Sequence, residues 1–296
     1  MAWPPLKDRL LSLLDPGYLL YGGARGRSEN GELVHYPSGP AFFIHAFRSF
    51  ILGGNLPTSL RLKQVRDDAF SDFWTKVTAP IDPPPPPAGS ATLVPPILSR
   101  AHGVVLDIGP GSGSHVSCFS DNANITAIYG AEPTLGLHAP LQQRIDEAKL
   151  TDKYHVLGCT ADKKELLSAL EKQGGVKQLS SDRGIFDTIV CVRVLCSVPN
   201  LDEAARELYS LLRPGGELMV VEHIRNPWTK NGSVLGRSMQ ILYTVLGWTF
   251  FLAGCEMGRD TASSLRKAGR WEAVELKTNF EWSALPYLSG TLTKVK

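Results

Sequence analysis

Val104-Val105-Leu106-Asp107-Ile108-Gly109-Pro110-Gly111-Ser112-Gly113 is the stretch that decides the fold of this chain. Three apolar residues lead to an acid, and glycines then alternate at positions 109, 111 and 113. The apolar run predicts a short buried strand. The glycines predict a turn whose backbone adopts left-handed dihedral angles or passes close to a ligand. With a helix expected from about Ser112, the stretch predicts the start of a β-α unit.

Two classes of ligand compete for such a loop. A dinucleotide fingerprint, G-x-G-x-x-G, needs a third glycine at position 114, where this chain has Ser114. A pyrophosphate also disfavours a nearby anion such as Asp107. The D-x-G-x-G-x-G pattern instead resembles the cofactor loop of class I S-adenosylmethionine (SAM) methyltransferases. SAM carries an ammonium and a sulfonium group, so Asp107 can help to hold its positively charged amino-acid end. A glycine-rich turn without a ligand remains the alternative for this loop taken alone.

Composition restricts the remaining choices. The chain has 296 residues, of which 43% are hydrophobic and 20% charged, and this is typical of an α/β protein with one large domain and an appendage. A net charge of +2 disfavours nucleic acid as a partner. The five cysteines form no CxxC pair and the histidines show no ligand spacing, so we expect reduced thiols and no metal. Because charged residues interrupt the first apolar stretch, we expect no secretory signal. The prediction is a cytoplasmic monomer or homodimer, free or peripheral to an intracellular membrane.

The region before the glycine loop is predicted to be helical. Residues 6–14 have an apolar helical face, residues 18–40 are expected to form a loop, and residues 60–77 form an amphipathic pattern. Residues 41–52 are very apolar, which indicates a helix packed on the main domain or, alternatively, one lying at a membrane face. Five consecutive prolines at 83–87 predict a stiff spacer. We therefore expect a helical cap over residues 1–80, a linker over 81–90 and the main domain over 91–296.

After the spacer, apolar strand patterns alternate with helical patterns, which predicts a mainly parallel sheet with crossover helices. Strands are expected at 104–108, 125–130, 154–157, 186–192, 217–222, 271–277 and 287–295, with a tight turn at 213–216. Seven strands in this rhythm resemble the Rossmann-like α/β sheet of class I methyltransferases. The resemblance implies that the last strand runs antiparallel to the others.

Ligands of such sheets bind outside the carboxyl ends of the strands, where the strand order reverses. Glu132 follows the second strand, where we expect an acid that accepts both ribose hydroxyls, and a surface acid at the start of a loop is the alternative. Asp162 follows the third, where the family resemblance implies a bond to the adenine amino group, and a helix N-cap is the alternative. Arg193 and Val194 follow the fourth, where backbone carbonyls would face the SAM amino group. With Asp107 and the three glycines, these residues form the predicted cofactor site.

Several motifs make the resemblance more specific. The segments VLCSVPN (194–200), LLRPGG (211–216), EHI (222–224) and FLAGCEMGRDTASSLRKAG (251–269) resemble the membrane-associated alkyl-thiol methyltransferases of the methyltransferase-like family. The block from Phe186-Asp187 onward also resembles small-molecule methyltransferases of the ubiquinone-biosynthesis type. This resemblance implies SAM as cofactor and S-adenosylhomocysteine as product.

An insertion at 224–259 is the expected substrate cap. Residues 238–255 contain no charged side chain. One interpretation is a helix that lines the acceptor pocket with Tyr243, Trp248, Phe250 and Phe251, and the other is a membrane-facing segment. Both favour a hydrophobic small molecule as acceptor. We further hypothesise that segments 41–52 and 238–255 meet as one lid.

His223 follows the fifth strand and is the candidate general base, because an alcohol, phenol or thiol acceptor must lose a proton. A structural histidine is the equal alternative, Glu222 is a weaker candidate base, and the acceptor atom is left open. The function predicted is methyl transfer to a hydrophobic thiol, hydroxyl or amine. The alternative is a SAM-binding protein with another role, such as a cyclase or a binding subunit.

Overall fold

The computed structural model describes residues 4–22, 24–27, 33–81, 86–174, 184–228 and 232–296. The chain divides into two compact units. Unit 1 comprises Met1–Pro86, Arg225–Gly258 and Phe280–Pro286, and unit 2 comprises Pro87–Ile224, Arg259–Asn279 and Tyr287–Lys296. Residues 82–85, which include three of the five prolines of the expected spacer at 83–87, lie outside the described residues.

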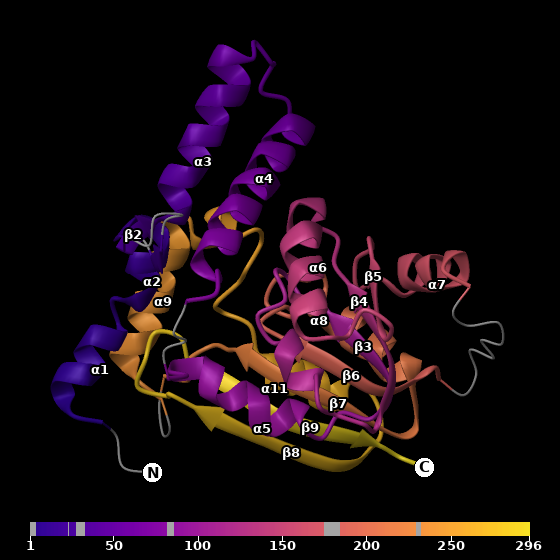
Figure 1. The fold of residues 1–296 in the computed structure, drawn as a ribbon. Coiled ribbons are helices and arrows are strands. Elements are labelled where there is room, and N and C mark those ends of the chain that lie inside the picture. The colour runs from indigo at the N-terminus through magenta and orange to yellow at the C-terminus, as the bar shows by residue number, and fades with distance from the viewer. Residues whose placement is uncertain (1–3, 23, 28–32, 82–85, 175–183, 229–231) are drawn as a thin grey trace. The chain divides into compact units, whose positions relative to one another are not determined.

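Unit 2 contains the seven-stranded sheet, in the order β5-β4-β3-β6-β7-β9-β8 (Figure 1). Strands β3 to β7 pair in parallel, whereas β9 is antiparallel to both of its neighbours. The predicted class of sheet, with its last strand antiparallel, is therefore confirmed. The strands are β3 (Gly103–Ile108), β4 (Ile125–Ala131), β5 (Tyr154–Leu157), β6 (Phe186–Val192), β7 (Leu212–His223), β8 (Trp271–Asn279) and β9 (Tyr287–Lys294).

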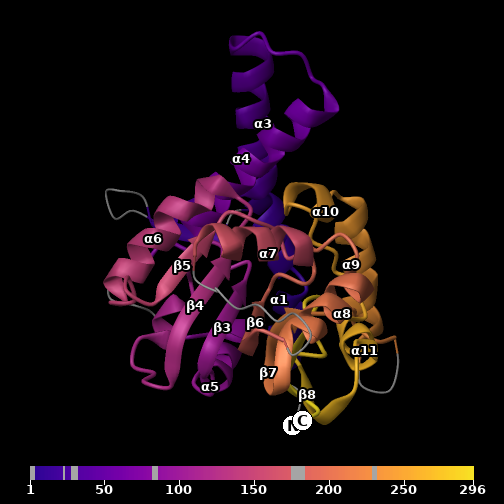
Figure 2. The same ribbon diagram turned by 90° about the vertical axis from the view of Figure 1, so that its right-hand side faces the viewer.

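Side chains alternate between the two faces of this sheet, as the pleat of a strand requires. Leu106 and Ile108 of β3 pack on the face that receives apolar residues of α7, α8 and α11. Val105 packs on the other face, with residues of α5 and α6. Both faces are covered, which explains why the central strands consist of nearly continuous apolar runs. The helices of unit 2, seen again in Figure 2, are α5 (Val94–Leu98), α6 (His138–Glu147), α7 (Lys163–Lys172), α8 (Leu201–Leu211) and α11 (Thr261–Lys267).

The prediction of a helix from about Ser112 is wrong. The loop after β3 runs in turns to a single 3-10 turn, Val116–Phe119. Gly111 and Gly113 have φ values of +61° and +83°, which interrupt a right-handed helix at the point where one would begin. The glycines that the loop needs are thus the reason why no α-helix follows it directly.

The tight turn expected at 213–216 is a bulge within β7. Phe186 pairs with Leu212 and Thr188 pairs with Glu217, so the intervening residues of β7 lie opposite Asp187 alone. The Asp187 carboxylate accepts hydrogen bonds from Arg213 and from the Val104 amide, which stabilises the bulge.

Unit 1 contains the N-terminal helices and the insertion. Its first helices are α1 (Leu6–Ser12), α2 (Asp15–Gly17), α3 (Ser38–Ala46) and α4 (Ser59–Val77), and a π-helical turn, Phe47–Leu52, extends α3. The prediction of a loop at 18–40 is wrong. This region contains a π-helical turn and two antiparallel strands, β1 (Ala24–Arg27) and β2 (Leu33–Tyr36). The β2 sequence LVHY suits a strand, and pairing with β1 satisfies its backbone groups.

The insertion forms two helices rather than one. α9 (Val234–Val245) and α10 (Trp248–Phe251) are separated by Gly247, whose φ of +96° ends the first helix. Among the residues that the structure describes, no helix is both long and apolar enough to cross a membrane.

The two apolar segments of the sequence pack together inside unit 1. The ring of Phe42 in α3 lies 4.9 Å from that of Phe250 and 5.9 Å from that of Phe251, both in α10. The Tyr243 hydroxyl in α9 donates a hydrogen bond of 3.0 Å to the Leu13 carbonyl. The hypothesised meeting of segments 41–52 and 238–255 therefore has a structural counterpart in this aromatic cluster.

Candidate active site

The glycine loop joins β3 to the rest of unit 2 through unusual backbone angles. Gly109, Gly111 and Gly113 have φ values of +59°, +61° and +83°, a region that residues with a Cβ rarely adopt. A Cβ on Gly109 would collide with the side chain of Val194. Glycine is thus needed both for the backbone angles and for the close approach of the segment that follows β6.

Glu132 reaches this loop from the end of β4. Its Oε2 atom accepts a 2.9 Å hydrogen bond from the Gly111 amide, and its Oε1 atom accepts one of the same length from the Thr134 amide. Glu132 is buried, and this burial raises the pKa of its carboxyl despite the two amide donors. The structure thus brings together two predicted site residues, Glu132 and Gly111, that are 21 positions apart.

Asp107 is fully buried at the end of β3, and its carboxylate has protein partners. The Nε2 atom of His115 lies 3.0 and 2.9 Å from the two carboxylate oxygens, and the Tyr154 hydroxyl donates a 2.8 Å bond to Oδ2. Burial, together with the charge of Asp107, raises the pKa of Tyr154 well above its ordinary value. In this arrangement Asp107 anchors the start of the glycine loop, and direct contact with the cofactor stays a prediction.

Sequence reasoning did not find the roles of His115 and Tyr154. The sequence places His115 two residues after the glycine loop and Tyr154 at the start of an expected strand, and neither position indicates a bond to Asp107. Tyr154 pairs with Ile128 in the sheet, and this parallel register determines that its hydroxyl reaches Asp107, 47 residues away. No local sequence signal carries that information.

The segment after β6 is held by a buried carboxylate from the neighbouring strand. Glu222 Oε1 accepts hydrogen bonds from the amides of Val194 (2.8 Å) and Leu195 (3.0 Å). Burial raises the pKa of Glu222 to about 8, although the two amide donors act in the opposite direction. Arg193 itself has a φ of +58°, and its guanidinium lies 3.4 Å from the Ser114 hydroxyl. The β6 segment therefore contacts the glycine loop at both Val194 and Arg193.

His223 ends β7 beside this carboxylate. Its ring is buried, lies edge-on to Tyr287, and has a nitrogen within 4.8 Å of the Cys196 sulfur. Burial acts to lower the pKa of His223, but Cys196 and Glu222 outweigh it and raise the pKa above its ordinary value. A buried imidazole with a raised pKa beside a thiol and a carboxyl is chemically suited to accepting a proton.

The other predicted residues have clear local contacts. Asp162 is the N-cap of α7, where its Oδ1 accepts bonds from the amides of Lys164 and Glu165. The three predicted acceptor-lining residues have contacts within unit 1. The Tyr243 hydroxyl bonds to the Leu13 carbonyl, and the Trp248 indole nitrogen donates a 3.1 Å bond to the Cys255 sulfur. Phe251 belongs to the aromatic cluster. The cap geometry thus accounts for Asp162, and an adenine contact stays a prediction.

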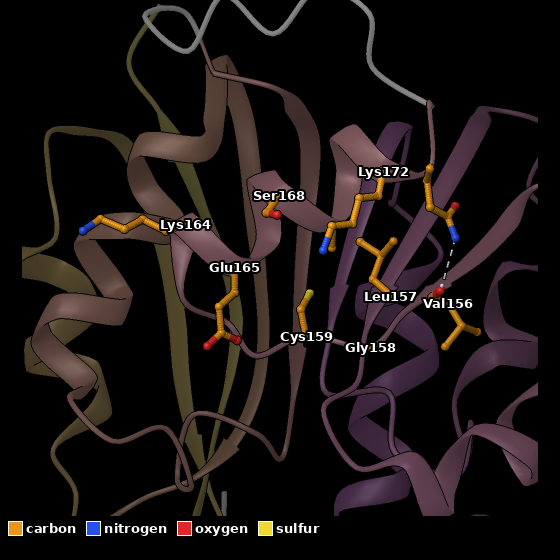
Figure 3. A pocket seen from close by; sticks show the side chains of 10 residues that line it. Val156, Leu157, Gly158, Cys159, Lys164, Glu165, Ser168 and Lys172 are labelled. Carbon is orange, nitrogen blue, oxygen red and sulfur yellow. Dashed lines mark hydrogen bonds between the residues drawn. The ribbon is translucent and has the colours of Figure 1, made fainter.

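A pocket of about 610 Å³ lies between the end of β5 and α7 (Figure 3). Cys159, Lys164 and Glu165 line it, and Glu165 is held there by the amide and hydroxyl of Thr160. Burial raises the pKa of Cys159 to about 11, so its thiol is protonated at neutral pH. None of the predicted site residues lines this pocket, and the glycine loop rather than the pocket remains the candidate cofactor site.

The residues at the carboxyl ends of β3, β4 and β6 fit SAM. Three of the five loop residues at 109–113 are glycines, a Cβ on Gly109 would collide with Val194, and Glu132 supplies an acid at the loop. The adjacent strands β3 and β6 are also where the strand order reverses, the usual ligand position of an open α/β sheet. Fold and site together define the class of SAM-dependent methyltransferases.

A family model described as a methyltransferase domain matches residues 87–272 of the chain. The chain therefore belongs to this methyltransferase family, as a class I enzyme whose cofactor is S-adenosylmethionine. The matched range contains the glycine loop, Glu132 and His223.

The individual proteins that the chain resembles are distant in sequence. The hybrid PKS-NRPS synthetase lepA of Aspergillus flavus is 24% identical over 239 residues, which are 77% of this chain and 5% of the synthetase. The human thiol S-methyltransferase TMT1B is 34% identical over 115 residues, 38% of this chain and 45% of that enzyme. The match thus spans less than half the length of this relative. The structure of a possible exported protein from Bordetella parapertussis is similar in fold, with a TM-score of 0.53 and 13% identity over 88% of this chain and 97% of that one.

Proposed function

We propose that the protein transfers a methyl group from SAM to a hydrophobic small-molecule acceptor, with thiols as the first class to test. The observation that carries the proposal is an intact glycine loop with Glu132 at the carboxyl ends of the adjacent strands β3 and β4, together with a buried proton acceptor, His223, at the carboxyl end of β7 in the same sheet. Further support comes from relatives that are thiol S-methyltransferases.

Cofactor binding is assigned to Asp107, Gly109, Gly111, Gly113, Glu132, Asp162, Arg193 and Val194. When bound, SAM supplies an electrophilic methyl group on a sulfonium. The chain itself has to orient the acceptor and exclude water from it. Asp107 contributes by fixing the loop through His115, and Glu222 contributes by fixing the Val194 and Leu195 amides.

His223 is proposed as the group that takes the proton of a thiol or hydroxyl acceptor. Protonation of His223 gives an imidazolium. The neighbouring Glu222 carboxyl, when it is ionised, stabilises this cation, which is why Glu222 acts to raise the pKa of His223. Because the pKa of His223 is raised, turnover should increase with pH to a plateau reached above the ordinary histidine range. An acceptor that is already a neutral amine needs this step least.

Unit 1 is proposed to select the acceptor. Its aromatic cluster of Phe42, Phe250 and Phe251 is built from the two apolar segments 41–52 and 238–255. Aromatic and aliphatic side chains favour apolar molecules with few polar groups. Tyr243, Trp248 and Phe251 remain the predicted acceptor-lining residues.

The test is release of S-adenosylhomocysteine from SAM across a panel of hydrophobic thiols, phenols and amines, together with the pH profile of the best acceptor. We expect His223→Gln to lower kcat by about 10²–10⁴-fold with a thiol or phenol while leaving SAM affinity unchanged. His102→Asn is the matched control, since His102 is exposed. If SAM binds but no member of the panel is methylated, a non-methylating role such as cyclisation is favoured instead. An unchanged kcat and pH profile in His223→Gln would exclude this histidine as the base.

A further inference from the structure

The tip of the α3–α4 hairpin in unit 1 has no core of its own. Across residues 43–64, which include the end of α3, the π-helical turn and the start of α4, no residue is buried. Large apolar side chains nevertheless dominate this tip. Phe47, Ile51, Leu52, Leu56 and Leu60 are 53, 68, 71, 78 and 79% exposed. Figure 1 shows α3 and α4 side by side, and these residues belong to the π-helical turn, the connecting segment and the start of α4 in this hairpin.

Exposed apolar residues are concentrated in unit 1. Among the described residues with large exposed apolar side chains, only Leu135 belongs to unit 2. Scattered exposed leucines are ordinary in proteins, but a continuous exposed apolar segment indicates an interaction surface. The exposed hairpin tip is therefore a candidate interaction surface.

The charges of the hairpin are distributed along its length. Residues 33–66 contain four Arg or Lys residues, at positions 48, 61, 63 and 66, and no Asp or Glu. The acids of α4 come later, at Asp67, Asp68 and Asp72. Of the basic residues, Lys63 and Arg66 lie 3.8 and 2.7 Å from Asp67, whereas the hydrogen bond of Arg61 goes to the neutral Gln64. Residues 43–64 thus combine apolar with basic side chains and contain no Asp or Glu, while Asp67 and Asp72 of α4 pair with Lys63 and His45 of this segment.

This pattern selects among partners. A twofold contact between two copies of the tip would place the same basic residues opposite one another, with no acid in the segment to pair with them. An anionic lipid surface instead accepts both features at once, since apolar side chains enter the acyl boundary and Arg or Lys residues remain at the headgroups. We propose that the tip, residues 43–64, docks on an anionic lipid surface by shallow insertion.

Such docking has a consequence for the proposed acceptor. A hydrophobic small molecule partitions into lipid, so a chain held at the surface meets it at a higher local concentration than in water. The docking itself does not depend on methyl transfer. It is measured without SAM or acceptor, so its failure is distinguishable from failure of the proposed function.

The experiment is flotation of the full chain with vesicles of phosphatidylcholine alone and with added phosphatidylserine, at low and high salt. We expect binding that increases with phosphatidylserine and decreases with salt. Ile51→Glu with Leu52→Glu should abolish flotation. Arg48→Gln with Arg61→Gln should weaken it about fivefold for each residue, because a basic residue near an anionic surface contributes about 1 kcal/mol.

The matched control is Leu135→Glu, which puts the same charge at an exposed leucine of unit 2 and should leave flotation unchanged. Circular dichroism checks that all variants fold, as expected for substitutions at exposed positions. The proposal is overturned if the wild-type chain floats with neither vesicle, or if the Ile51→Glu/Leu52→Glu variant floats like the wild type. A concentration-dependent dimer in sedimentation velocity that the same substitutions dissociate would also overturn it, and would assign the tip to self-association.

Discussion

His115 Nε2 lies 2.9 Å from Asp107 Oδ2, and both side chains are buried. The bond ties Asp107, the last residue but one of β3, to the segment that follows the glycine loop, so the loop is held at both ends. The arrangement also explains why an acid stands two residues before the first glycine.

Gly111→Val should abolish SAM binding. The residue has a φ of +61°, and its amide donates to Glu132, so a side chain would strain the backbone and displace the acid from the loop. Calorimetry of the purified protein measures the effect. Gly89→Val is the control, because Gly89 has a φ of +55° and open space around it, and this variant should bind SAM normally. Undiminished affinity in Gly111→Val would refute the assignment of the loop.

Tyr154→Phe should lower the free energy of unfolding by about 1.5–3 kcal/mol, the usual loss for a hydrogen bond to a charged group. The hydroxyl donates to buried Asp107, and its removal leaves that carboxylate with His115 alone. Urea titration gives the value. Tyr209→Phe, which removes a hydroxyl bond to the Arg270 carbonyl, should cost only about 0.5–1.5 kcal/mol. Equal losses in the two variants would contradict a special role for the Asp107 bond.

Glu222 should make stability depend on pH. Its pKa is about 8 in the folded protein and near 4.5 when unfolded, so between these values the folded state binds more protons. The free energy of unfolding therefore decreases as pH rises from about 4.5 to about 8, with a slope of at most about 1.4 kcal/mol per pH unit from this group. Glu222→Gln keeps an acceptor for the Val194 and Leu195 amides and removes the titration. Unfolding curves at several pH values should then be flatter for the variant, and parallel curves would show that the carboxyl does not titrate this way.

Phe42→Ala should destabilise unit 1 and reduce acceptor turnover without changing SAM affinity. Phe42 is 9% exposed and packs on Phe250 and Phe251, and truncation of a buried phenylalanine costs up to about 3–5 kcal/mol. Phe43→Ala, at a side chain that is 62% exposed, provides the comparison and should be milder. Thermal unfolding, calorimetry with SAM and the methyl-release assay measure the three effects. Loss of SAM affinity in Phe42→Ala would show that the role of unit 1 is not limited to selecting the acceptor.

Local properties of the chain were enough to predict the sheet. Strand and helix patterns are read from the spacing of apolar residues within a short stretch. Glycines 109, 111 and 113 likewise indicate backbone angles that only glycine adopts easily. The family resemblance added that the last strand runs antiparallel, and Glu132 could be placed after the second strand. These signals lie within a few residues of the features they predict.

Tertiary structure alone decided the contacts that make these features a site. Asp107 meets Tyr154 through the parallel register of β3, β4 and β5, and Glu222 meets Val194 because β6 and β7 are neighbours. Unit 1 is assembled from three separate stretches, including Phe280–Pro286, which carries no signal of its own. Such contacts join residues tens of positions apart, and their distances depend on the register and packing of whole elements. The sequence by itself determined the elements and their dihedral needs, and packing determined which side chains meet.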